Sequence, residues 1–408
     1  MSEEKLVPKL RFDGFNKVWE SKQIGEIAEV VGGGTPKTEI VDYWDGEIKW
    51  FTPSEIGKTK YVFDSDRHIT EKGLKNSSAK LLPKDALLLS SRATVGEISI
   101  ALTECSTNQG FQSLITKSNV DNDFIYYLIS TIKNEFLRRS SGSTFLEINK
   151  NEIKRMPINI PELSEQKKIS NLFSAIDNKI EMLEKKCEYY QDFKKYLMQR
   201  IFSSSDDKLR FKSADGEQYS DWKERNLYEF LTEHKLKSTG NEEVYSVSVH
   251  KGLVNQKEHL GRDFSAPDTS KYNLVKPGDI VYTKSPTGDF PLGIIKQSRV
   301  DKNVIVSPLY GVFTPETYAL GYILNDYFES NVNTHNYLHP IVQKGAKNTM
   351  NITNKTFLSK TLFVPTDVNE QQKIAECFSK VNDSIRNIEI QQNKVNEFKK
   401  GLLQQMFV

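Results

Sequence analysis

Cysteine is scarce in this sequence. Its 408 residues include only Cys105, Cys187 and Cys377, and these lie far apart along the chain. They form no Cys-x-x-Cys pair and no Cys/His group with the spacing of a zinc site. The spacing therefore favours buried thiols over disulfide bonds or a bound metal.

Long apolar runs and an excess of one charge are also lacking. No segment approaches the roughly 18 apolar residues of a membrane-spanning helix, and the opening MSEEKLVPKL has no apolar signal-peptide core. We therefore expect a cytoplasmic protein. The 56 Lys and Arg residues against 54 Asp and Glu residues leave a net charge of +2. A nucleic-acid surface would therefore have to come from local clusters of basic residues.

Recognisable catalytic motifs are missing. Gly57-Lys58-Thr59 resembles the end of a phosphate-binding loop, but Thr52 stands where the first glycine of that motif belongs. The run from Gly32 to Pro36 lacks a strand-loop-helix context, so we interpret it as a turn. No Pro-Asp…Glu-x-Lys nuclease pattern stands out. We therefore expect no catalytic residue and no cofactor in this chain.

A seven-residue apolar repeat is what the sequence does contain, and it occurs twice. The first copy runs from Ile169 to Ile201, and the second begins 205 positions later at Ile374. This spacing predicts two long amphipathic helices whose apolar seams pair. The residues that we expect to pair the helices are Ile169, Phe173, Ile176, Ile180, Leu183, Leu197, Ile374, Phe378, Val381, Ile385, Ile388 and Leu402.

Identities outside the seam indicate an internal duplication, because core periodicity does not dictate them. Glu165-Gln166 recurs as Glu370-Gln371, and Phe193-Lys194-Lys195 recurs as Phe398-Lys399-Lys400. Lys194 and Lys399 occupy apolar positions of the seam. Polar residues at such positions lower stability but can fix register and partner.

The rest of the chain also divides into two similar halves. Leu10-Arg11-Phe12 followed by Trp19 is echoed by Leu209-Arg210-Phe211 followed by Trp222. Each half then has a proline-containing turn before an apolar strand, at 86–89 and 280–282, and a helix near 123–137 or 316–331. The predicted segments are a first domain at 1–160, a long helix at 161–205, a second domain at 206–364 and a second long helix at 365–408. The hinge between the halves is expected at 203–207.

Two copies of one unit in a chain tend to pack about a pseudo-twofold axis, as identical subunits do. The expected fold is therefore α/β (α+β), with two globular domains separated by two long helices that form an antiparallel coiled coil. A helix of about 37 residues is roughly 55 Å long, whereas DNA half-sites repeat about every 34 Å. Such a spacer can hold two domains over separate segments of one duplex. Phe407 should then lie near 10–12, as Phe202 leads into 209–211.

These features resemble the specificity subunit of type I restriction-modification enzymes. The resemblance rests on the order of parts, the Leu-Arg-Phe…Trp openings, Trp50 with Thr52-Pro53-Ser54, the Pro-x-Asp turn, and the Glu-Gln-x-x-Ile helix start that occurs twice. It implies two target-recognition domains, each of which reads one half of an interrupted double-stranded DNA sequence. It also implies two N6-adenine methyltransferase (modification) subunits and ATP-driven translocase-nuclease subunits as partners. Those partners would use S-adenosylmethionine, ATP and Mg.

The absence of a methyltransferase motif agrees with that division of labour. An adenine methyltransferase of the family needs an Asn/Asp-Pro-Pro-Tyr/Phe element, and Ser307-Pro308-Leu309-Tyr310 does not match it. The exposed aromatic residues expected on the helices, Tyr189, Phe193, Tyr196 and Phe398, either contact methyltransferase subunits or cover the adjoining domains. Both interpretations stay open.

DNA contacts are expected from polar loops that follow the strands, because base edges and phosphates are bound chiefly by Arg, Lys, Asn and Gln. For each residue the alternative is an ordinary solvated loop. The candidates are Arg92, Thr94, Asn108, Gln109, Arg138, Arg139, Lys251, Lys257, Arg262, Lys284, Lys344 and Lys347.

Two other functions compete with this hypothesis. A coiled-coil adaptor that joins proteins without binding DNA would lack basic surfaces on its two domains. A self-contained nuclease or methyltransferase would need an acidic cluster or cofactor loop that we do not find.

Overall fold

The computed structural model describes residues 6–142, 146–203, 208–257, 268–284, 286–344 and 350–408. Most of the expected hinge, at 204–207, and the candidates Arg262 and Lys347 lie outside these residues. Contacts divide the chain into two units, Met1–Lys185 with Glu389–Val408 and Lys186–Ile388. The four-segment division stays a prediction. None of the helices in the described part of the chain is long and apolar enough to span a membrane.

The first unit is built on a five-stranded sheet. Its strand order is β2 (Ala28–Gly32), β9 (Gln112–Thr116), β6 (Leu87–Leu89), β7 (Ile98–Ala101), β4 (Tyr61–Val62). The three leucines of β6 are all buried, because apolar side chains cover both faces of this central strand. A three-stranded sheet adjoins it, in the order β5 (His68–Ile69), β3 (Trp44–Phe51), β8 (Cys105–Thr107). The remaining elements are β1 (Glu20–Gln23), which pairs with β10 (Pro157–Ile160), and helices α1 (Ile24–Ile27), α2 (Glu71–Lys75), α3 (Asn122–Thr131), α4 (Lys133–Arg138) and α5 (Lys150–Arg155).

The second unit has a four-stranded sheet. Its order is β12 (Leu231–Glu233), β19 (Gly311–Pro315), β16 (Ile280–Tyr282), β17 (Ile295–Gln297). Four strand pairs surround it: β11 (Lys223–Asn226) with β22 (Thr361–Val364), β13 (Tyr245–Ser248) with β14 (Gly252–Asn255), β15 (Asn273–Val275) with β18 (Val304–Val306), and β20 (Gln343–Lys344) with β21 (Met350–Asn351). Its short helices are α8 (Tyr318–Phe328), α9 (Asn331–Leu338) and α10 (Asn354–Leu358).

The sheets confirm the duplication. The order β2-β9-β6-β7 of the first unit is repeated as β12-β19-β16-β17 in the second, and every neighbouring pair in both is antiparallel. The expected single helix at 123–137 is instead two helices, α3 and α4. The break falls at Ile132, whose φ of −104° and ψ of 17° leave the helical region. The two units differ in the segment before β6 or β16, where β3, β4 and β5 have no equivalent order in β13, β14 and β15.

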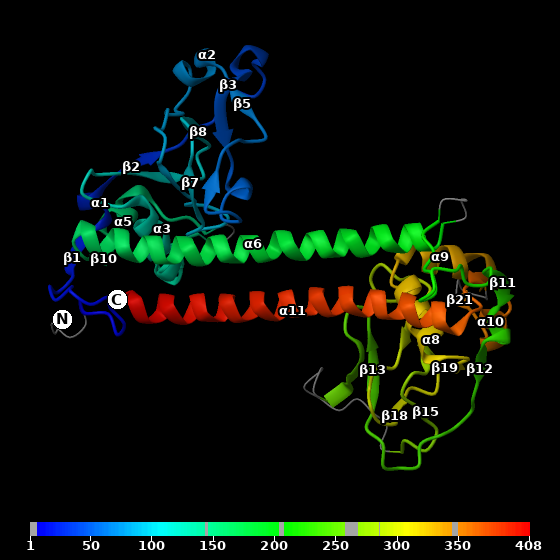
Figure 1. The fold of residues 1–408 in the computed structure, drawn as a ribbon. Helices are drawn as coiled ribbons and strands as arrows, with labels where there is room; N and C mark the ends of the chain where they lie inside the picture. The colour runs from blue at the N-terminus through cyan, green and yellow to red at the C-terminus, as the bar shows by residue number, and fades with distance from the viewer. Residues whose placement is uncertain (1–5, 143–145, 204–207, 258–267, 285, 345–349) are drawn as a thin grey trace. The chain divides into compact units, whose positions relative to one another are not determined.

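The two long helices are α6 (Leu163–Ile201) and α11 (Val368–Met406), each of 39 residues and continuous along its length (Figure 1). In the first unit, Ile169 and Phe173 near the start of α6 share a buried cluster with Leu402 near the end of α11. In the second unit, Leu197 near the end of α6 shares a cluster with Ile374 near the start of α11. Start meets end in both units, so the pairing is antiparallel.

The other residues expected to pair the helices lie on the same faces. Ile176 is buried in the first cluster, and Ile180 packs against it. Val381 and Phe378 are buried in the second cluster, and Ile385 packs against it. Leu183 and Ile388 are also buried.

The paired motifs of the sequence meet in a buried ionic clamp in each unit. Arg11 donates to Glu165 through Nε at 2.8 Å and Nη2 at 2.7 Å, and Trp19 Nε1 donates to the same carboxylate at 3.4 Å. The second clamp repeats this with Arg210 (2.7 and 2.9 Å) and Trp222 (2.9 Å) around Glu370. Each clamp therefore ties the opening of a half to the start of a long helix.

The ends of the long helices also meet these openings. In the first unit, Leu10 N–H donates to Gln405 O at 3.0 Å, and Phe407 packs in the same cluster as Phe12. In the second, Leu209 N–H donates to Arg200 O at 2.9 Å. The expected proximity of Phe407 to 10–12 is confirmed.

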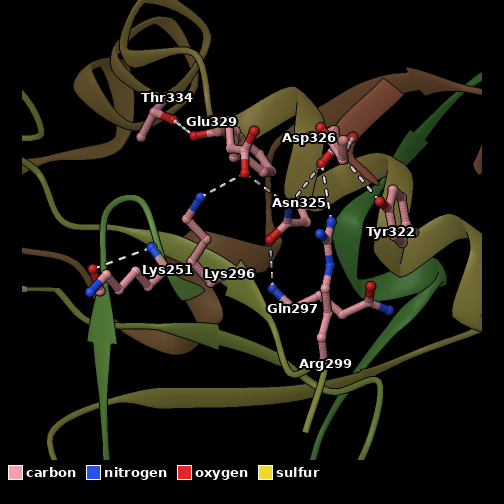
Figure 2. Close-up of polar contacts among 12 residues, drawn as sticks. Lys251, Lys296, Gln297, Arg299, Tyr322, Asn325, Asp326, Glu329 and Thr334 are labelled. Atoms are coloured by element: carbon pink, nitrogen blue, oxygen red, sulfur yellow. Dashed lines mark hydrogen bonds and ion pairs between the residues drawn. The ribbon is translucent and has the colours of Figure 1, made fainter. Parts of the chain in front are cut away.

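The lysines that interrupt the helical seam have acidic partners. In the second unit Lys194 pairs with Glu329 and lies 3.7 Å from Asp326. Lys296 joins Glu329 at 3.0 Å and Arg299 joins Asp326 at 3.2 Å, and Figure 2 shows these side chains pointing toward one another. These five residues form the ionic network. In the first unit, Lys399 pairs instead with Asp177 of α6.

Candidate nucleic-acid interface

Four loops of the first unit converge, and we call them the loop cluster: 32–36, 52–55, 90–94 and 107–110. Ser91 N–H donates to Gly110 O at 2.8 Å, and Gly34 N–H donates to Thr107 O at 2.8 Å. Thr94 Oγ1 donates to Pro53 O at 3.4 Å. The structure therefore brings the sequence candidates of the strand ends 90–94 and 107–110 into one place.

Side chains of the loop cluster differ in how freely they can meet a ligand. Arg92, Thr94 and Gln109 are exposed, whereas Asn108 is half-buried. Asn108 Oδ1 accepts the Gly110 N–H at 2.8 Å, which holds the 107–110 turn. Gln109 Oε1 accepts from the Thr35 hydroxyl, so the amide nitrogen of Gln109 is the end that is free to donate outward.

The glycine-rich run 32–36 serves close packing of the loop cluster. A Cβ on Gly33 would lie 2.0 Å from Asn108 O, and a Cβ on Gly34 would lie 2.4 Å from Ala79 N. Both distances are far below van der Waals contact, so only glycine lets these backbones approach. The run is not followed by a helix of the kind that holds phosphates.

Each arginine that the sequence put forward in the first unit has a carboxylate nearby. Arg92 Nε lies 3.9 Å from Glu147 Oε2. Arg138 pairs with Glu135 at 2.6 Å. Arg139 lies 3.8 Å from Glu152. Because Ile148 N–H donates to Ser91 O at 2.9 Å, the segment that carries Glu147 packs directly on the loop cluster.

The candidates of the second unit are more scattered. Lys251 is exposed in the turn of the β13–β14 hairpin, and Lys257 is exposed just after β14. Lys284 follows β16 with a φ of 58° and is half-buried; burial lowers the pKa of its ammonium, and nearby Glu233 acts in the opposite direction. Lys344 belongs to β20, but its side chain lies outside the described part of the structure. No hydrogen bond or ion pair joins Lys251, Lys257 and Lys284 within the described residues.

The sequence analysis missed an arginine held on aromatic rings. Trp44 and Trp50 of β3 contact each other edge to face, with centroids 5.1 Å apart, and Arg67 lies over the Trp44 ring at 3.6 Å. The even spacing of the two tryptophans on one strand was a usable signal that they share a face. Nothing in the sequence placed Arg67 on it.

A pair formed by half-buried His234 and buried Asp279 was also missed, and it stabilises the fold. His234 Nε2 lies 2.8 Å from Asp279 Oδ2, and Asp279 also accepts from the Lys276 N–H and the Thr314 hydroxyl, both at 2.7 Å. These bonds hold the turn that precedes β16. Among the described residues, His, Cys, Asp and Glu side chains form no group of three that could hold a metal ion.

Comparisons with known proteins point to one family. Residues 16–188 match the type I restriction modification DNA specificity domain. The MjaIX specificity subunit of Methanocaldococcus jannaschii is 41% identical over 176 residues, which are 42% of this chain and 41% of that protein. The EcoR124I/EcoR124II specificity subunit of Escherichia coli is 27% identical over 191 residues, 42% of this chain and 47% of that protein. The chain thus spans less than half the length of the curated relatives it matches.

A structural comparison extends over the whole chain. The crystal structure of a type I restriction-modification system S subunit from M. genitalium has a TM-score of 0.64 at 15% identity, and covers 98% of this chain and 99% of that one. At this identity the likeness concerns the fold. Residues 16–188 are thus similar to the type I restriction modification DNA specificity domain, and the fold of the whole chain is similar to that of an S subunit.

Proposed function

We propose that this protein is the non-catalytic DNA sequence-recognition subunit of a type I restriction-modification complex. Each domain binds one half of a bipartite, interrupted DNA target. The observation that carries the proposal is the duplication, in which the same sheet order, ionic clamp and antiparallel helix pairing occur once in each unit. Two equivalent domains in one chain can each bind one of two DNA segments.

The proposed partners supply the chemistry. Two modification subunits, with S-adenosylmethionine, would methylate adenine, and restriction subunits would use ATP and Mg. The exposed aromatic side chains of α6 are suited to contact a protein partner: Tyr189 and Phe193 stack in parallel with centroids 6.3 Å apart, and Tyr196 is exposed as well. Aromatic residues are enriched in protein interfaces. Phe398 of α11 is likewise exposed.

The decisive experiment is a domain exchange. The chain is co-expressed with a cognate modification subunit, and N6-methyladenine is mapped across the host genome. We expect one interrupted sequence to be methylated. Replacement of residues 1–155 by the corresponding segment of another specificity subunit should change one half of that sequence and leave the other. Retention of both half-sites after the exchange would contradict the modular arrangement, and assembly without DNA binding would favour the adaptor.

A salt titration tests the basic candidates of the second unit. Lys251→Ala and Lys257→Ala should each weaken binding for all sequences and reduce the slope of log K against log salt by about 0.9 for each phosphate that is no longer neutralised. Lys75→Ala is the matched control, because this exposed lysine pairs with Glu71 at 3.1 Å. An unchanged slope would remove Lys251 and Lys257 from the interface.

A further inference from the structure

Arg67 presents an exposed guanidinium whose orientation is fixed. Its central carbon lies 3.6 Å from the centroid of Trp44 and 5.7 Å from that of Trp50. Stacking occupies one face of the guanidinium, but its N–H donors point outward in the plane of the group. The edge of Arg67 is therefore left available to a ligand.

The backbone of Arg67 is also held in place. Its carbonyl oxygen accepts from the Trp50 N–H at 3.0 Å and from the Ser65 hydroxyl at 2.7 Å. Trp44 is in turn fixed by a bond of 3.2 Å from its Nε1 to Lys37 O. A long side chain that is ordered before binding loses less entropy when it binds.

This arrangement is joined directly to the loop cluster. Trp50 Nε1 donates to Gly34 O at 2.9 Å, and the N–H of the same glycine donates to Thr107 O at 2.8 Å. Because the Trp50 N–H also donates to Arg67 O, three hydrogen bonds connect Arg67 to the turn that carries Asn108 and Gln109. One ligand could engage the exposed groups of both.

Ion pairing distinguishes Arg67 from the other candidate arginines of the first unit. Arg92, Arg138 and Arg139 each have a carboxylate within 3.9 Å, whereas no ion pair joins Arg67 to any residue of the described chain. The acids next to it have other partners or none: Asp64 pairs with His68 at 3.0 Å, and exposed Asp66 forms no ion pair with Arg67. The positive charge of Arg67 is left for a ligand that supplies acceptors.

We infer that Arg67, positioned by Trp44, is a base-reading residue that determines specificity in the first half of the DNA target. A planar fork of N–H donors matches the O6 and N7 acceptors of guanine in the major groove, and this pair is the commonest specific contact in protein–DNA complexes. The inference rests on the proposed function, because it requires that the first domain bind DNA.

The test uses the full chain assembled with its modification subunits and a duplex that carries the mapped target. Each guanine of the first half-site is replaced in turn by 7-deazaguanine, which lacks the N7 acceptor. Replacement of one particular guanine should weaken binding by the wild-type complex. The loss should be at most roughly 5- to 150-fold, which is what one bidentate contact contributes. In the Arg67→Ala variant, 7-deazaguanine at that position should no longer weaken binding. The methylated sequence should also lose its requirement for guanine at that base.

Two further variants separate base reading from charge. Arg67→Lys retains the positive charge but not the planar fork. The slope of log K against log salt should therefore match that of the wild type, whereas the preference for guanine should be lost. Arg138→Ala, an exposed arginine paired with Glu135, should leave the 7-deazaguanine profile unchanged.

The possible results can be told apart. If Arg67→Ala keeps the profile, if Arg67→Lys keeps full guanine preference, or if the first half-site contains no guanine, the inference about Arg67 is overturned while the proposed function stands. If the complex shows no sequence-specific binding at all, the proposed function fails first. Arg67 is exposed, so we expect Arg67→Ala to fold, and thermal unfolding checks this.

Discussion

Replacing Glu165 by glutamine should strongly destabilise the first unit. The Glu165 side chain is 1% exposed and accepts two hydrogen bonds from Arg11, whose side chain is 12% exposed. Glutamine retains one oxygen, but its amide group faces an Arg11 donor and leaves the guanidinium without a counter-charge. Breaking a buried ion pair by removal of one partner costs about 3–5 kcal/mol, so we expect a loss of this size in the free energy of unfolding.

The matched control is Glu162→Gln, three residues earlier. Glu162 pairs with Lys17 at 3.0 Å, but the two side chains are 42% and 85% exposed. Exposed pairs contribute at most about 1 kcal/mol. Urea unfolding of both variants should therefore differ by about 2–4 kcal/mol.

Hydrogen exchange locates the effect. Glu165→Gln should lower the protection of backbone amides at 10–23 and leave those at 209–226 unchanged, and Glu370→Gln should do the reverse. The reasoning about the clamps would be refuted if Glu165→Gln cost no more than Glu162→Gln, or if either variant lowered protection equally in both openings.

Three further predictions concern single side chains. Burial raises the pKa of Glu329, but the lysines of the ionic network outweigh it and lower that pKa to about 2. Its folded-state pKa is thus below the unfolded value, so its contribution to stability is present above pH ~4.5 and is lost as pH falls toward ~2. The difference in Tm between the wild type and Glu329→Gln should narrow over that range, and a constant difference would contradict it. Gly33→Ala should lower the free energy of unfolding in urea by about 3 kcal/mol, because the added Cβ clashes with backbone atoms. Gly401→Ala has open space around the added Cβ and should raise that free energy by about 1 kcal/mol. Burial raises the pKa of Cys105 to about 12, so mass spectrometry should find it alkylated only after denaturation, and labelling in the native protein would count against this.

The sequence was most informative where a repeat imposed a constraint. The seven-residue spacing predicted both long helices, because an apolar seam must face its partner at every second turn. Identities outside the seam were also informative, because the apolar repeat does not explain why Glu165 recurs as Glu370, whereas equivalent partners in the two units do. The structure shows those partners to be Arg11 and Arg210.

The sequence was least informative where the two halves differ. The strands β3, β4 and β5 belong only to the first unit, so the comparison of halves could not predict them. Arg67 lies in that segment and meets Trp44 across 23 positions of sequence, through a strand pairing that contains a bulge. The candidate DNA contacts were chosen by residue type and loop position, and spacing along the chain cannot show which arginine has a neighbouring carboxylate.

The seam lysines of the two units have acidic partners that come from different elements. Lys399 pairs in the first unit with Asp177 of α6, which also accepts the Tyr127 hydroxyl at 2.6 Å. The position 205 residues after Asp177 is Asn382, which is neutral. In the second unit the acids beside Lys194 are instead Glu329 and Asp326, and Asn382 donates to Asp326 at 2.9 Å.

The acid therefore belongs to the long helix α6 in the first unit and to the globular domain in the second, and in each unit it lies beside the seam lysine. A cation that is buried without a counter-charge would cost several kcal/mol. A lysine kept at an apolar seam position thus requires an acid nearby, but not an acid on one particular element. This requirement constrains how the ends of the long helices pack against each domain. It places no constraint on the sequence of the loops.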